Sequence, residues 1–169
     1  MFVINALKEI CIRCGDNQHL TLKASAPEAL QIKDLMKIFA QGLVRQLQLD
    51  LNKYTVHISS GFGYFPKVPW VGITYKKQRV SKNISICLCF SKTGEGFVAG
   101  AMNPYPITSG EKTTIDRNQS KDKFISLIGG DQRTTNYDDK FFNPKDFYKN
   151  KIVLKDLVEH LKDSFKYLS

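Results

Sequence analysis

Residues 84–90 read ISICLCF, and the order of these side chains decides the fold class. Apolar residues recur at every second position from Ile84 to Phe90, and a period of two is typical of a β-strand. Residues two apart share one face of a strand, so Cys87 and Cys89 are expected to face one core layer. The stretch therefore predicts a strand near the middle of the chain.

Further strands are expected on both sides of this stretch. Residues 54–59 alternate between apolar and polar side chains. A further strand is expected from about residue 68 through Ile73, and another over 97–102. Glycine-containing turns and the polar, basic residues 75–83 connect these segments. Strands joined by short turns predict an antiparallel meander.

Helices are expected before and after the strands. Residues 2–13 and 154–168 place apolar side chains at helical spacing. A long helix is expected to begin at Ser25, which forms a capping-box pattern with Glu28, and to run to about Leu49. The predicted fold class is therefore α+β, an antiparallel β-sheet meander flanked by N-terminal and C-terminal helices.

The other segments carry weaker signals. Residues 103–120 are predicted to form a loop, 122–128 a short helix, and 130–150 an irregular segment rich in aromatic residues. His160 is expected on the solvated face of the last helix. The length fits one domain spanning residues 1–169.

The charge balance gives the first indication of function. The chain has 25 Lys and Arg against 16 Asp and Glu, a formal net charge of +9. Such an excess favours a polyanionic partner, because bound cations are released when basic side chains neutralise phosphates. The chain shows no apolar run long enough to span a membrane and no secretory signal at its start. We therefore expect a cytoplasmic protein with no membrane partner.

The four cysteines form a CxxC that begins at Cys11 and a CxC that begins at Cys87. A zinc site needs a second pair at ligand spacing or nearby histidines, which this pattern does not supply. We interpret the cysteines as small buried side chains in a reducing compartment, with zinc binding and redox chemistry as the alternatives. No metal site is expected.

Common catalytic motifs are missing from the sequence. It has no phosphate-binding GxxxxGK[ST] loop, no GxSxG and no HExxH. His57 is expected on the polar side of a strand, and no residue near it in sequence suggests a catalytic pair. We therefore expect no catalytic residue, no cofactor and no enzymatic activity in this chain.

Residues 57–102 resemble a known family. They contain a Gly61-Phe62-Gly63 turn, then Val68-Pro69-Trp70, a strand that ends in Leu88-Cys89-Phe90, and a Gly94–Gly96 turn before the next apolar strand. This order of features resembles the N-terminal DNA-recognition domain of McrB-type modification-dependent restriction systems. The long helix before it and the amphipathic helix at the end match in order.

The resemblance implies a function. Domains of that family recognise methylated cytosine in duplex DNA, so this chain is expected to be a DNA-binding module that targets a restriction complex. The expected partners are a AAA+ GTPase motor in the same polypeptide and a separate nuclease subunit. On this view residues 1–169 are an excised N-terminal recognition domain.

Reading one modified base favours flipping it out of the duplex into a pocket. Phe62 suits the wedge that fills the vacated space, because Gly61 and Gly63 let the backbone approach DNA closely. Trp70 suits the pocket floor, since bases stack on aromatic side chains. The expected pocket consists of Trp70, Ile84, Leu88 and Tyr137. The expected phosphate-binding residues are Lys67, Lys76, Lys77, Arg79 and Lys82.

Each expected site residue also has a structural interpretation. Trp70, Phe62 and Leu88 can be core residues, and the basic segment can be a solvated loop. Ile84 stands where the methylcytosine-binding relative has tyrosine, so another modified base, or readout without flipping, stays open. The alternative functions are a protein-interaction or assembly domain of a defence system, an RNA-binding domain, and an enzyme with an unrecognised site.

Overall fold

The computed structural model describes residues 2–15, 21–59, 61, 63–66, 68–80, 83–91, 93–102 and 143–168. Its elements are α1 (Phe2–Cys14), α2 (Pro27–Leu47), β1 (Tyr54–Ile58), β2 (Trp70–Tyr75), β3 (Ser85–Phe90), β4 (Gly96–Met102), β5 (Lys145–Tyr148) and α5 (Leu154–Ser164), with the 3-10 helices η3 (Lys149–Lys151) and η4 (Phe165–Tyr167).

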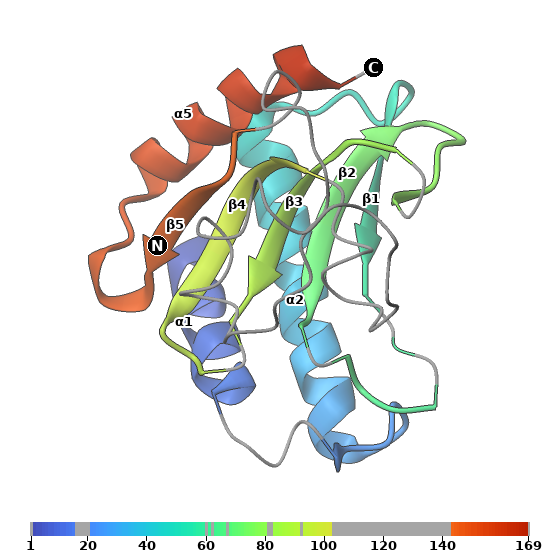
Figure 1. The fold of residues 1–169 in the computed structure, drawn as a ribbon, viewed down its shortest axis with the longest axis vertical. Coiled ribbons are helices and arrows are strands. Elements are labelled where there is room, and N and C mark those ends of the chain that lie inside the picture. The colour runs from blue at the N-terminus through green and yellow to red at the C-terminus, as the bar shows by residue number, and fades with distance from the viewer. Residues whose placement is uncertain are drawn as a thin grey trace, which may run out of the picture.

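The five strands form one antiparallel sheet in the order β1-β2-β3-β4-β5. In Figure 1, α1 and α2 lie behind the sheet, and α5 runs along the β5 side. The predicted α+β class, with a meander flanked by N-terminal and C-terminal helices, is confirmed. Within the described part of the chain, no helix has the length and apolar character needed to cross a membrane.

The strand β5 was not predicted, and the expectation that residues 130–150 are irregular is wrong for Lys145–Tyr148. Only Phe147 of this strand is buried, so the segment has no apolar period of two. A Cβ atom on Gly96 would collide with the carbonyl oxygen of Phe147, so the glycine lets β4 and β5 approach each other. Residues 103–120 and 122–128 lie outside the described part of the chain.

The start of α2 differs from the predicted capping box. The N-cap is Ala26, with φ −65° and ψ 146°, and no side chain caps the helix. The Ala26 N–H donates to the Lys23 carbonyl at 2.9 Å, and this turn leaves Ser25 outside the capping position. The helix ends at Leu47, where Gln48 adopts a left-handed conformation with φ 51°.

The sheet is buried on both faces. On the helix side, β2, β3 and β4 contribute Val71, Ile73, Ile86, Leu88, Phe90 and Phe97 to the core with α1 and α2. The opposite face carries a second apolar cluster of Val68, Val80, Cys87, Cys89, Val98, Ala101 and Met102, against which Trp70 and Ile84 pack. The prediction that Cys87 and Cys89 face one layer is confirmed.

His160 was expected to be solvated, and this expectation is wrong. Its Nε2 lies 3.0 Å from the Ala99 carbonyl oxygen, and its ring packs at 5.7 Å from the Phe147 ring. Because α5 lies against β4, the histidine is half-buried between the helix and the sheet.

Candidate nucleic-acid interface

The connection between β1 and β2 contains the glycine turn. Gly61 has φ +70° and Gly63 has φ +73°, and both are exposed. L-residues with a side chain rarely adopt this region, so the turn favours glycine at both positions. Phe62, the expected wedge, lies outside the described residues.

The turn is anchored to the chain that precedes α2. The Ala24 N–H donates to the Gly63 carbonyl at 3.0 Å, and the Phe65 N–H donates to the Leu22 carbonyl at 2.8 Å. Phe65 itself is buried in the helix-side core. Backbone hydrogen bonds to the segment before α2 therefore hold the turn with the exposed glycines in place.

Two residues beside the turn were missed by the sequence analysis. Tyr64 is 60% exposed and forms a β-bridge with Lys23, which is also exposed. An exposed aromatic ring next to a cation is a suitable surface for nucleic acid. The two residues are far apart in sequence, so no local motif could have linked them.

Trp70 begins β2 at the same end of the hairpin as the glycine turn. Its N–H donates to Ser59 Oγ at 2.8 Å, and its carbonyl accepts from the Ser59 N–H at 2.9 Å. Its ring is half-buried and lies over Gly72, where an added Cβ would be 3.2 Å from Trp70 Cζ3. The tryptophan thus lies on the sheet face opposite the helices.

The structure does not bring the expected pocket residues together. Leu88 pairs with Val71 and is fully buried in the helix-side core, whereas Trp70 pairs with Cys89 on the other face. The expectation that Leu88 lines a pocket with Trp70 is therefore wrong, because neighbouring residues of a strand point to opposite faces.

Ile84 lies on the same sheet face as Trp70 but at a different point along the strands. It precedes β3 and falls outside the alternation that places Ile86 on the helix side. Ile84 is five positions from Cys89, the register partner of Trp70, which corresponds to about 17 Å along a strand. Tyr137 lies outside the described residues.

The described basic residues lie at the other end of the β1–β2 hairpin. Lys76, Lys77 and Arg79 are exposed and follow the last residue of β2, which is five residues, or about 17 Å, from Trp70. They were expected to bind phosphates, and this role stays a prediction; in space they lie apart from Trp70, the expected pocket floor. Lys67 and Lys82 lie outside the described residues.

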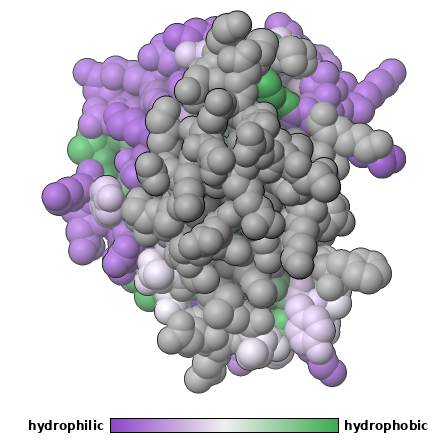
Figure 2. All heavy atoms as spheres, in the orientation of Figure 1, coloured by the Kyte–Doolittle hydropathy of each residue, from purple (hydrophilic) through white to green (hydrophobic). Residues whose placement is uncertain are grey.

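Lys53 joins this group in space. Its carbonyl accepts from the Lys76 N–H at 2.8 Å, and its Nζ lies 5.3 Å and 5.6 Å from the centroids of the Tyr54 and Tyr75 rings. These two rings stack with centroids 5.3 Å apart. We call Lys53, Lys76, Lys77 and Arg79 the basic end. Figure 2 shows hydrophilic side chains at the upper right, the region where β2 ends in Figure 1.

The basic end has the electrostatic character of a phosphate-binding surface. None of its four cations forms an ion pair with a carboxylate of the described residues. The nearby Asp50 accepts the Asn52 N–H at 2.9 Å within its own turn. The Lys76 Nζ donates to the Leu51 carbonyl at 3.3 Å, a contact that leaves its charge without a carboxylate among the described residues. Exposed cations of this kind can bind phosphate oxygens.

His57 and Thr74, on the sheet face opposite the helices, do not form a catalytic pair that a substrate can reach. His57 Nε2 lies 2.8 Å from Thr74 Oγ1, and burial lowers the pKa of His57 below its ordinary value of 6.5. Thr74 is fully buried, so its hydroxyl cannot meet a substrate.

Burial raises the pKa of Cys11 and Cys87 to about 12, which leaves both thiols protonated and unreactive.

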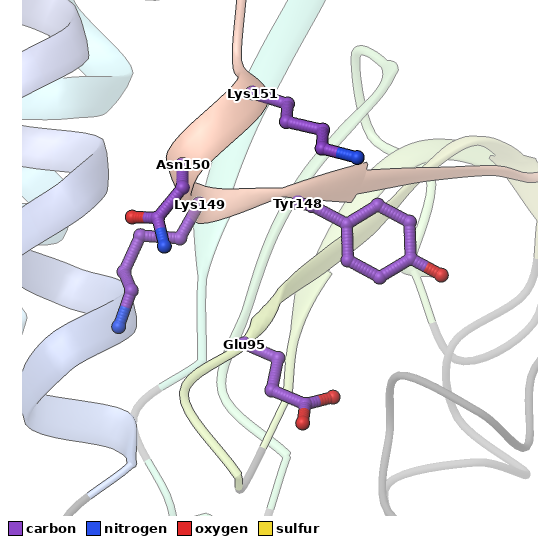
Figure 3. Close-up of a pocket in the computed structure, with 5 residues that line it drawn as sticks. All are labelled: Glu95, Tyr148, Lys149, Asn150 and Lys151. Carbon is purple, nitrogen blue, oxygen red and sulfur yellow. The ribbon is translucent and has the colours of Figure 1, made fainter.

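A separate pocket of about 420 Å³ lies at the end of β5, lined by Glu95, Tyr148, Lys149, Asn150 and Lys151. Figure 3 shows that Lys149 and Lys151 point away from each other. Since the two cations do not converge and Glu95 adds a negative charge, the pocket does not form an anion site.

No protein family, curated protein or solved structure matches the chain. The resemblance to McrB-type recognition domains therefore remains a prediction based on the residues alone.

Proposed function

We propose that this protein is a DNA-binding module that recognises a modified base in duplex DNA, with methylated cytosine as the first candidate, and so targets a restriction complex. The observation that supports this most is the exposed turn at Gly61 and Gly63, held on its base by backbone hydrogen bonds from Ala24 and Phe65. In the sequence Phe62 lies between two residues without side chains, as a wedge entering a base stack requires.

The base, once flipped, stacks on Trp70, which starts β2 at the end of the strand pair that the glycine turn connects. Tyr64 and Lys23 contact the DNA strand next to the wedge. Leu88 takes no part, since it lies in the helix-side core.

The basic end binds phosphates at a distance from the flipped base. Trp70 and Lys76 are separated by the length of β2, about 17 Å. Phosphates follow each other about every 3.4 Å along one strand of B-DNA, so the hairpin, laid along the duplex, reaches about five nucleotides. The GTPase motor and the nuclease subunit of the family remain the proposed partners for cleavage.

The test is a titration against matched duplexes that contain cytosine, methylcytosine, hydroxymethylcytosine or N6-methyladenine, at one moderate salt concentration, followed by fluorescence anisotropy. We expect one modified duplex to bind at least tenfold more tightly than the unmodified one. Phe62→Ala and Trp70→Ala should abolish this preference. Tyr148→Ala removes an aromatic ring that is 46% exposed on β5 and serves as the matched control.

Equal binding to all four duplexes, unchanged in both variants, would refute base readout. It would leave the alternative, an assembly domain of a defence system that meets DNA only through its charge.

A further inference from the structure

The strand β1 forms one edge of the sheet, with β2 as its neighbour. The Ser59 N–H donates to the Trp70 carbonyl at 2.9 Å, and the Lys76 N–H donates to the Lys53 carbonyl at 2.8 Å. In this antiparallel register every second residue of β1 therefore bonds to β2. The N–H and C=O groups of Val56 and Ile58 consequently point away from β2, towards the outer edge.

A groove of about 430 Å³ runs along this edge, between β1 and α2. One wall is formed by the helix-side residues of β1 and the other by α2, and Leu51, which is 54% exposed, lies among the lining residues. The lining residues are Lys37, Ala40, Gln41, Val44, Leu51, Tyr54, Thr55, Val56 and Ile58. Outward backbone groups beside an apolar groove match the two needs of an added strand, backbone pairing and pockets for alternate side chains.

The charges around the groove favour an acidic occupant. The lining contains Lys37 and no carboxylate, although Lys37 also pairs with Asp34 at 2.8 Å on the exposed surface. Lys53, at the start of β1, adds a second cation beside one end of the groove. A second copy of the chain is a poorer occupant, because each copy carries a net charge of +9.

We propose that the edge of β1 and the groove beside it bind an extended acidic segment of a partner protein, added to the sheet as a sixth strand. The five residues of β1 span about 17 Å, so the bound segment is about five or six residues long. Its apolar side chains enter the groove at alternate positions, and its acidic ones lie towards Lys37 and Lys53. This surface is separate from the glycine turn, shares Lys53 alone with the basic end, and serves assembly, not base readout.

The probe is a capped hexapeptide in which valine alternates with glutamate, added to the isotope-labelled protein and followed by NMR and amide hydrogen exchange. We expect exchange at Val56 and Ile58 to slow at least tenfold when the peptide is saturating. Thr55 and His57 are internal controls, because their amides are already bonded to β2. The same peptide with lysine in place of glutamate, or with N-methylated backbone amides, should bind at least tenfold more weakly.

Three variants of the protein separate strand pairing from folding. Val56→Pro removes the outward N–H together with the valine side chain, so it should weaken peptide binding at least tenfold, while Val56→Ala removes the side chain but keeps the donor and should weaken it less than threefold. Leu51→Glu changes an exposed groove residue and should also weaken binding in a folded protein. The proposal would be overturned if Val56→Pro and Leu51→Glu both bound the peptide as tightly as the unsubstituted protein does. The proposal would also be overturned if amide exchange at Val56 and Ile58 did not slow at millimolar peptide, or if dimerisation without peptide protected these amides.

Discussion

Trp70 and Leu88 lie on opposite faces of one sheet, although their register partners are neighbours: Trp70 pairs with Cys89, and Leu88 pairs with Val71. Leu88 is fully buried under the helices, while Trp70 is half-buried on the other face. The two side chains therefore cannot touch one bound base, and substitutions at the two positions should have different effects.

Leu88→Ala should lower the free energy of unfolding by about 2–5 kcal/mol, because it leaves a cavity in the helix-side core. Urea denaturation measures this loss, with the exposed Leu51→Ala as the control that should change little. Under conditions where Leu88→Ala is folded, its preference for a modified duplex should match the unsubstituted protein. A variant that is fully stable but has lost the preference would place Leu88 in the binding site after all.

Alanine at the two turn glycines should not be equally damaging. Both positions have positive φ, which costs a residue with a side chain roughly 1–2 kcal/mol. A Cβ on Gly61 would also collide with the Tyr64 carbonyl oxygen, whereas a Cβ on Gly63 would meet nothing within 4 Å. Thermal and urea unfolding should show Gly61→Ala as clearly less stable than Gly63→Ala. Equal losses would mean that the backbone near Tyr64 moves aside without cost.

The sequence predicted β1 and β3 from an apolar period of two, and β2 and β4 from apolar segments between turns. It missed β5, where Phe147 is the only buried residue, and it misplaced the start of α2, where a turn from Lys23 to Ala26 competes with the capping box. Strands and helices with a clear apolar pattern can be predicted from the sequence. A short strand such as β5 and the exact start of a helix depend on tertiary contacts.

The site was harder to predict because position in sequence does not fix position in space. Lys76 follows Trp70 closely in the chain, but the length of β2 separates them. Lys53 and Lys76 are distant in the chain yet share a backbone hydrogen bond. Only the register of β1 on β2 reveals the basic end.

Removing cations from the basic end should weaken DNA binding without changing base preference. Each DNA phosphate that is no longer neutralised by a lysine should reduce the slope of log affinity against log salt by about 0.9. Lys76→Gln combined with Lys77→Gln should therefore flatten the slope by up to about 1.8. Lys155→Gln is the matched control. It removes an exposed lysine on α5 whose Nζ lies 3.9 Å from Glu159 Oε1. An unchanged slope in the double variant would show that DNA does not bind at this end.

Acid should destabilise the protein through its half-buried histidines. Burial lowers the pKa of His160 below 6.5, and this effect outweighs the hydrogen bond from the ring to the Ala99 carbonyl, which raises it. Lys145 also lowers this pKa, and Asp163 raises it. The unfolded chain thus takes up a proton near pH 6.5, while the folded protein takes it up only at lower pH. The stabilisation is complete above about pH 6.5 and is lost as the pH falls below it.

His160→Gln keeps a side-chain N–H that can reach the Ala99 carbonyl but cannot titrate. Its free energy of unfolding should therefore fall less between about pH 7.5 and 5.5 than that of the unsubstituted protein, measured by urea denaturation at several pH values. His57→Gln should act in the same direction, because burial lowers the pKa of His57 as well. If both variants keep the full pH dependence, the loss of stability in acid arises from carboxylates, since they would then be the groups that take up protons on unfolding.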